Sequence, residues 1–278
     1  MEMNKKVAFI GTGNMGYALI CAASKSIQSD YIYITDYDAA KAEAVAKEIG
    51  CHVVKNNEEA ASVADYIFLC VKPQVIGSVL AQISPILETN QTKGCTKTLV
   101  SIAAGLTLQN LHSKLSADLV NFPLIRIMPN TPASIGMGML ALCAAPEVEP
   151  QRIEDVMTIL SKAGRVEQLP EHLMDAFSAV GGCAPAYVYI FIEALADGAV
   201  MAGLNRKQAL TYAAQTVMGS AAMVLETGRH PGELKDAVCS PAGSTITGVA
   251  ALERNGFRSS VIEAVIDSYH KNRDLNNN

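Results

Sequence analysis

The motif with the clearest chemistry is a glycine-rich turn near the N-terminus. Gly11-Thr12-Gly13-Asn14-Met15-Gly16 follows an apolar run at residues 7–10 and precedes a helix-like segment. Glycines at this spacing allow a tight turn, close approach of a pyrophosphate to the backbone and close helix–strand packing, while the helix N-terminus offers free N–H groups. We therefore expect a dinucleotide site. The alternative is a glycine-rich turn of an unrelated α/β fold, whereas the lack of a following Lys disfavours a nucleotide triphosphatase.

An acidic residue stands where the ribose of a dinucleotide would be recognised. Asp36 follows the second predicted strand, residues 31–35, at the usual distance after the glycines. A carboxylate there accepts hydrogen bonds from the ribose hydroxyls and repels a 2′-phosphate. The alternative roles are a solvated turn residue and the N-cap of the next helix, and Asp36 and Asp38 compete for both. Lys55 and Lys72 can still supply positive charge nearby.

Two further loops follow predicted strands at the edge of the sheet where open α/β folds bind ligands. Val71-Lys72-Pro73-Gln74 is one, and Met128-Pro129-Asn130-Thr131-Pro132 is the other. The two prolines around Asn130 fix the backbone, so that an amide or a carbonyl could be aimed at a ligand. A rigid strand exit would explain either loop equally well.

A loop late in the chain combines small residues with hydroxyl groups at the start of a helix. It runs from Cys239 to Gly248 and contains Ser240, Gly243, Ser244 and Thr245. Backbone N–H groups and side-chain hydroxyls at a helix start can bind an anion such as a carboxylate. Taken alone, the same pattern also fits an ordinary helix N-cap.

The elements around these motifs divide the chain into two parts. Predicted strands lie at residues 7–10, 31–35, 66–71, 98–102 and 124–128 and near residue 166, and predicted helices at 14–25, 39–49, 75–87 and 150–162. Because these strands are continuously apolar, we expect a doubly wound parallel sheet of Rossmann type over residues 1–168. Residues 169–278 predict only helices, at 184–202, 207–226, 245–253 and 259–271, and hence an all-helical dimerisation and substrate domain.

The helix at residues 184–202 is apolar nearly all the way round, which requires burial on every side in a soluble protein. A second subunit could bury it, although an ordinary core helix is an alternative interpretation. The segment carries Glu193 and Asp197 and is short for a membrane span, so we expect no membrane association.

The amino-acid composition limits the classes of partner that the chain can bind. The chain has 278 residues, of which 22 are Lys or Arg and 27 are Asp or Glu, and no stretch concentrates the cations as nucleic-acid binding would need. We therefore expect a small-molecule substrate and no nucleic-acid partner. The seven cysteines include no metal-ligand or CxxC cluster, so no metal is expected. No secretory signal is recognisable at the N-terminus, and we expect a cytoplasmic protein.

Taken together, the segments resemble the pyrroline-5-carboxylate reductase family over nearly the whole chain. The similarity lies in GTGNMG, FLCVKPQ, SIAAGLTL, RIMPNTPASIGMGM, APAYVYIFIEALADGAVMAGL and, most specifically, HPGELKDAVCSPAGSTITGVAALERNGFRSSVIEAV. The resemblance implies a Rossmann domain joined to a helical domain that interlocks with a second subunit, many members forming a decamer of five dimers. It also implies reduction of 1-pyrroline-5-carboxylate to L-proline with NADPH or NADH, the last step of proline biosynthesis.

The resemblance also assigns site residues. The implied cofactor-binding residues are Gly11, Gly13, Asn14, Met15 and Gly16 at the pyrophosphate, Asn57 by the adenosine, and Lys72, Pro73, Ala103 and Ala104 along the ribose and nicotinamide. To these we add Asp36 at the ribose, and Val71 and Asn130 in the two loops that follow strands, from their own positions in the sequence. Ser240, Gly243, Ser244 and Thr245 match the loop that holds the substrate carboxylate. The Thr245 hydroxyl is implied near the imine nitrogen as the catalytic group. An imine needs little further acid help, so hydride delivery depends mainly on positioning.

The chain departs from the common family pattern at a few positions. Its loop reads Pro-Ala-Gly-Ser-Thr where Pro-Gly-Gly-Thr-Thr is common, so Ala242 replaces a glycine. Asp36 replaces the Ser, Asn or Arg that receives a 2′-phosphate, and we expect NADH to be used at least as well as NADPH. Two other functions stay open: another imine or enamine reductase of this architecture, and a non-catalytic dinucleotide sensor, which would not need to retain Ser240 to Thr245.

Overall fold

A computed structural model describes residues 5–94 and 97–276, which pack as two compact units. The first unit extends to Gly182 and also includes the C-terminal segment from Tyr269. The second unit is Cys183–Ser268. The predicted division at residues 168 and 169 stays a prediction. Of the cysteines, Cys95 lies outside the described residues.

The first unit is built on one eight-stranded sheet in the order β3-β2-β1-β4-β5-β6-β7-β8. Its strands are β1 (Val7–Ile10), β2 (Ile32–Thr35), β3 (His52–Val53), β4 (Tyr66–Leu69), β5 (Thr98–Ser101), β6 (Leu124–Met128), β7 (Gly138–Ala144) and β8 (Gly164–Gln168). β1 pairs in parallel with both β2 and β4, so the strand order reverses at β1. The carboxyl ends of β1 and β4 therefore form the crevice in which such sheets bind ligands.

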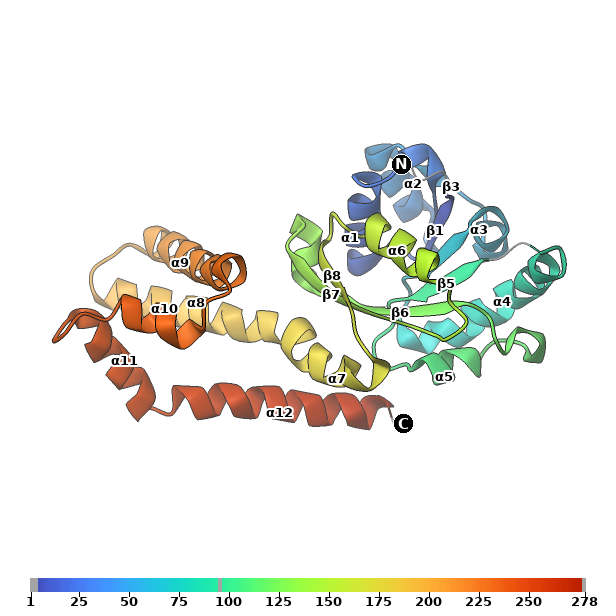
Figure 1. The fold of residues 1–278 in the computed structure, drawn as a ribbon. Coiled ribbons are helices and arrows are strands. Elements are labelled where there is room, and N and C mark those ends of the chain that lie inside the picture. Colours follow the sequence, from blue (N-terminus) through green and yellow to red (C-terminus); the bar gives the residue numbers. More distant parts are fainter. Residues whose placement is uncertain (1–4, 95–96, 277–278) are drawn as a thin grey trace. The chain divides into compact units, whose positions relative to one another are not determined.

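Helices lie on both faces of this sheet (Figure 1). The α-helices of the first unit up to Gly182 are α1 (Asn14–Ser24), α2 (Ala39–Ile49), α3 (Asn57–Val63), α4 (Pro73–Thr92), α5 (Leu108–His112), α6 (Pro150–Ile159) and α7 (Met174–Phe177). The strands β1, β4 and β5 are buried along their whole length, as expected for strands covered on both faces. Phe9 and Phe68 stack in this core with ring centroids 4.6 Å apart.

Two strands of the sheet were not predicted. β3 has only two residues and pairs in parallel with β2, whereas β7 pairs antiparallel with β6 and parallel with β8. The connection from β6 to β7 contains only a short 3₁₀ helix, Thr131–Ile135. A parallel pair needs a crossover of a dozen or more residues, so a link this short leaves only the antiparallel arrangement. The sheet is thus parallel except at one pair, and the predicted Rossmann-type fold class is confirmed.

The second unit is entirely helical, as predicted. Its helices are α8 (Ala184–Met201), α9 (Arg206–Thr227), α10 (Pro231–Ala237), α11 (Ser244–Arg254) and the greater part of α12 (Phe257–Asn276). α8 packs mainly against α9, where Ala196, Ala209 and Ala213 are buried. The short helix α10 was missing from the prediction because its seven residues begin at Pro231, in a run of turn-forming residues.

Much of the second unit's apolar surface is exposed within the single chain. Ile190 on α8 is 66% exposed, and Leu225 and Ile262 are similarly exposed on α9 and α12. The helical stretch Glu171–Met201 is long and apolar enough to cross a membrane by length and composition, with a mean hydropathy of 1.5. An apolar face of this size requires a cover, which is either another protein chain or lipid.

Candidate active site

Each of the three glycines in the first loop has a different structural role. Gly11 has φ +103°, and a Cβ there would lie 2.7 Å from the carbonyl oxygen of Cys70. At Gly16 a Cβ would lie 2.3 Å from the Gly11 carbonyl oxygen, so only glycine lets α1 approach β1 this closely. A Cβ at Gly13 would meet open space. Gly13 thus leaves room for a ligand to approach the backbone, and the glycine roles expected from the sequence agree with this geometry.

The N-terminus of α1 presents unsatisfied backbone donors beside this open space. Gly13 caps the helix without any side-chain hydrogen bond, and the first turn contains no acidic residue. Asn14 is exposed at the first helical position, and Met15 packs partly against the core. Free N–H groups and the positive end of the helix dipole at such a place favour phosphate.

Asp36 is tied to the glycine loop. Its Oδ2 accepts hydrogen bonds from the Thr12 N–H at 2.6 Å and from the Thr12 hydroxyl at 2.9 Å, and its Oδ1 accepts from the Asp38 N–H at 3.1 Å. Burial by itself would raise the pKa of Asp36, but these hydrogen bonds outweigh it, and the pKa lies below its ordinary value. The carboxylate is therefore ionised at neutral pH, beside the predicted pyrophosphate loop.

Of Asp36 and Asp38, only one caps the helix α2 that follows them. Asp38 is the N-cap of α2, where its Oδ1 accepts a hydrogen bond from the Lys41 N–H at 3.3 Å. Asp36 has no part in that cap. The carboxylate of Asp36 remains available to a ribose hydroxyl, since each oxygen can accept more than one hydrogen bond.

The neighbouring loops lie where the sequence placed them. The Cys70 N–H donates to the Ile10 carbonyl at 2.8 Å, so the segment Val71-Lys72-Pro73 leaves the sheet directly beside the glycine loop. Lys72 caps α4, and Pro73 occupies its first position. After β5, Ala103 is buried and Ala104 is exposed at the same edge. Asn57 begins α3, and its Nδ2 donates to Gln82 Oε1 at 2.7 Å.

Asn130 holds protein backbone with both atoms of its amide. Its Nδ2 donates to the Gly181 carbonyl at 2.8 Å, and its Oδ1 accepts from the Met139 N–H at 3.1 Å. The side chain is buried, and these bonds join the end of β6 to β7 and to the turn before α8. The expected aiming of this amide at a ligand is therefore replaced by a structural role for the side chain. Contact of Asn130 with a cofactor stays a prediction.

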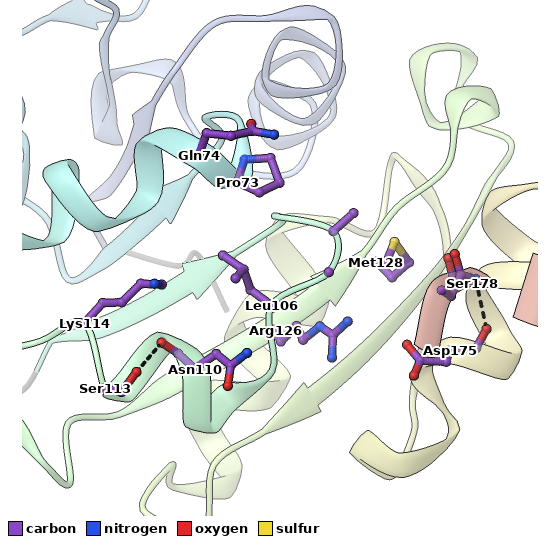
Figure 2. Close-up of a pocket in the computed structure, with 13 residues that line it drawn as sticks. Pro73, Gln74, Leu106, Asn110, Ser113, Lys114, Arg126, Met128, Asp175 and Ser178 are labelled. Carbon is purple, nitrogen blue, oxygen red and sulfur yellow. Dashed lines mark hydrogen bonds between the residues drawn. The ribbon is translucent and has the colours of Figure 1, made fainter. Parts of the chain in front are cut away.

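A cavity of about 590 Å³ opens next to these loops, and sequence reasoning did not find it (Figure 2). Pro73 and Ala104 line one part of it, and Lys114, Arg126 and Met128 line others. Arg126 lies on β6 and is only 2% exposed. Its Nη1 lies 3.4 Å from Glu171 Oε1, and its Nε is buried without a hydrogen-bond partner. A charged residue inside the apolar strand run Leu-Ile-Arg-Ile-Met was the available signal.

The hydroxyl-rich loop lies in the second unit, between α10 and α11. The Gly243 N–H donates to the Ser240 carbonyl at 3.1 Å, and Gly243 caps α11 without a side-chain hydrogen bond. A Cβ at Gly243 would lie 2.3 Å from Ser240 Oγ and 3.1 Å from the Ser240 carbonyl oxygen, so a side chain there would displace the Ser240 hydroxyl. Ser244 and Thr245 are exposed in the first turn, and no acidic residue stands in that turn. The loop therefore offers backbone N–H groups and hydroxyls to an anion.

The backbone of Ala242 has a conformation that is unusual for a residue with a side chain. Its φ is +57°, in the left-handed region that favours glycine. Among the residues that the structure describes, it is the only non-glycine residue with a positive φ. The glycine common at this place in the family is thus explained, and Ala242 holds the same turn at a conformational cost.

Two family models match the chain. The model described as pyrroline-5-carboxylate reductase dimerisation matches residues 171–275, and the model described as NADP oxidoreductase, coenzyme F420-dependent, matches residues 6–105. The first match covers the helical part of the chain, and the second covers the glycine loop and the strands around it.

The chain also matches individual relatives over nearly its full length. The chain is 42% identical to pyrroline-5-carboxylate reductase of Escherichia coli over 98% of this chain and 99% of that protein. Among solved structures, it is similar to Plasmodium falciparum pyrroline carboxylate reductase with NADP bound, with a TM-score of 0.83, 31% identity and coverage of 99% and 100%. It is also similar to a pyrroline-5-carboxylate reductase from Coxiella burnetii, with a TM-score of 0.90, 28% identity and coverage of 98% and 99%.

Proposed function

Since this chain belongs to the pyrroline-5-carboxylate reductase family, we propose that its glycine loop and its hydroxyl-rich loop hold the two reactants of that family's reaction. The enzyme reduces the C=N bond of 1-pyrroline-5-carboxylate with NAD(P)H and yields L-proline, the last step of proline biosynthesis. The observation that carries the assignment is the match at 42% identity over nearly the whole chain, together with retention of Ser240 to Thr245.

The residues of the first unit fit a dinucleotide. The space beyond Gly13 and the free N–H groups of α1 suit a pyrophosphate, with Gly11, Asn14, Met15 and Gly16 completing the loop. Asp36 faces the ribose side, with Asn57 by the adenosine, and Val71, Lys72, Pro73, Ala103, Ala104 and Asn130 toward the other half. When bound, the cofactor supplies a hydride from its nicotinamide ring.

The residues of the second unit fit the substrate. The N–H groups at the start of α11 and the hydroxyls of Ser240 and Ser244 bind the substrate carboxylate, with Gly243 keeping the turn tight. Thr245, on the same helical turn, donates its hydroxyl to the imine nitrogen. This hydrogen bond draws electron density from the C=N carbon that accepts the hydride, and it holds the ring in one orientation. The catalytic contribution of the chain is therefore positioning together with one polar donor.

The proposed enzyme is assembled from more than one copy of the chain. The exposed apolar faces of α8, α9 and α12 fit a second copy of the chain, in agreement with the dimerisation family that matches residues 171–275. The helical stretch Glu171–Met201 is then covered by protein and does not enter a membrane. Five such dimers form a decamer. The net charge of −5 is consistent with a cytoplasmic enzyme that binds no nucleic acid.

A reductase assay tests this function. Purified enzyme is given 1-pyrroline-5-carboxylate with NADH or with NADPH, and L-proline is quantified. We expect stoichiometric oxidation of the nicotinamide and formation of proline. Cofactor binding without turnover would favour the dinucleotide sensor, and faster turnover of a six-membered cyclic imine would favour a different imine reductase.

A further inference from the structure

The cavity beside α5 contains a buried guanidinium with too few partners. Arg126 is 2% exposed, and a guanidinium carries five N–H donors. Within the described residues its side chain donates to one acceptor, Glu171 Oε1 at 3.4 Å, and its Nε donates to none. Burying a charged group with one long hydrogen bond is costly unless another acceptor completes its shell.

Glu171 cannot complete that shell alone, because it is engaged elsewhere. The same Oε1 atom accepts the Leu108 N–H at 2.6 Å, a much shorter contact than the one to Arg126. Glu171 therefore mainly satisfies the first N–H of α5, which leaves the guanidinium in need of an acceptor from inside the cavity.

The lining of the cavity indicates the kind of acceptor. Two cations, Lys114 and Arg126, and one carboxylate, Asp175, line it, and the Glu171 carboxylate lies 3.4 Å from Arg126. Asn110 adds an amide, while Leu106 and Met128 supply apolar wall. Figure 2 shows the guanidinium of Arg126 in the middle of these side chains. A planar guanidinium recognises carboxylates by paired hydrogen bonds, and the apolar wall suits a carbon skeleton better than a bare inorganic anion.

We propose that this cavity binds a small organic acid, with the carboxylate on Arg126 and the apolar body against Leu106 and Met128. A volume of about 590 Å³ accommodates a metabolite of that class. The residues that line the cavity belong to the first unit. The inference does not depend on which imine the enzyme reduces.

Calorimetric titration with glutarate and with benzoate tests the site without any turnover. Replacing Arg126 risks unfolding the core, so the diagnostic variant is Asn110→Asp, which adds a negative charge to the cavity wall and keeps a residue compatible with the first turn of α5. The matched control is Gln109→Glu, which adds the same charge one residue away, where the side chain is exposed and lies outside the cavity.

We expect both carboxylates to bind the wild type, to bind Asn110→Asp about tenfold more weakly, and to bind Gln109→Glu with nearly the wild-type affinity. Inorganic phosphate should bind more weakly than the organic acids. Equal binding by the two variants, or no binding of either carboxylate to the wild type, would overturn the proposal. Because no step of the test uses pyrroline-5-carboxylate, failure here leaves the reductase function untouched.

Discussion

The two units bury their apolar side chains to very different extents. In the first unit, whole strands such as β1 and β4 are buried, and a continuous core surrounds them. In the second unit the buried cluster consists of three alanines on α8 and α9, while larger side chains such as Ile190 and Leu225 face outward. At roughly 25 cal/mol per Å² of apolar surface, the first unit gains most of its stability from itself and the second does not.

This difference separates two binding tasks. The glycine loop belongs to the unit with its own core, whereas the hydroxyl-rich loop belongs to the unit that needs a partner. Cofactor affinity should therefore survive damage to assembly, and substrate turnover should not. The following variants test that separation.

The largest effect is expected from a charge in the apolar face of α8. Ile190→Asp should abolish the dimer and lower kcat/KM for the imine below detection, because an aspartate at the interface would be buried without a partner. Sedimentation and an activity assay measure both, and cofactor affinity should stay within about tenfold. The control is Val120→Asp, which places the same charge at an equally exposed apolar residue of the first unit. A stable and active monomer would contradict the proposed interface.

The next largest effect concerns the proposed donor. Thr245→Ala should lower turnover at saturating substrate by about 10- to 1000-fold, the range for a lost polar donor, and leave cofactor affinity nearly unchanged. Thr247→Ala is the control on the same helix, because the Thr247 hydroxyl already donates to the Gly243 carbonyl at 3.1 Å. Wild-type turnover in Thr245→Ala would exclude a hydrogen bond to the imine.

A smaller effect is expected on cofactor choice. Asp36→Ser should remove repulsion from a 2′-phosphate and shift the ratio of kcat/KM toward NADPH by about 1 to 3 kcal/mol, since the wild type should use NADH at least as well as NADPH. Asp38→Ser is the control, because Ser keeps the cap of α2. If the wild type strongly prefers NADPH and Asp36→Ser leaves the ratio unchanged, then Asp36 does not face the ribose.

The smallest effect concerns the strained turn of the substrate loop. Ala242→Gly should raise the free energy of unfolding of the assembled enzyme by about 0.5 kcal/mol, because relief of the φ of +57° exceeds the extra entropy of glycine in the unfolded chain. Ala250→Gly, in the interior of α11, should instead lower it by about 1 kcal/mol. Urea unfolding measures both, and equal losses in the two variants would argue against strain at Ala242.

The sequence predicted the fold class, most elements of both parts and the glycine loop, because each has a strong local signal. It failed at β7, whose run Gly-Met-Leu-Ala-Leu-Cys-Ala contains residues that favour helices more than strands. The sheet overrides that preference, since β6 and β8 supply its hydrogen-bond partners on both sides. Long-range pairing of this kind has no signature within a short window.

Prediction of the site was limited in the same way. The spacing of Gly11, Gly13 and Gly16 and the acid after the second strand are local features, and both could be recognised. That the amide of Asn130 is engaged by Gly181 and Met139 depends on residues far along the chain. The cavity around Arg126 likewise forms only where β6, α5 and α7 meet in the fold, so no sequence motif predicts it.

The course of α12 has a consequence for how the protein is made. This helix begins in the second unit and ends in the first, where Asn272 Nδ2 donates to the Asp175 carbonyl at 3.3 Å. On the ribosome, the sheet of the first unit emerges early, but its last helical segment emerges only after all of the second unit has been synthesised. The nascent first unit therefore waits, with the surface around Asp175 uncovered, until translation reaches the final turns of α12.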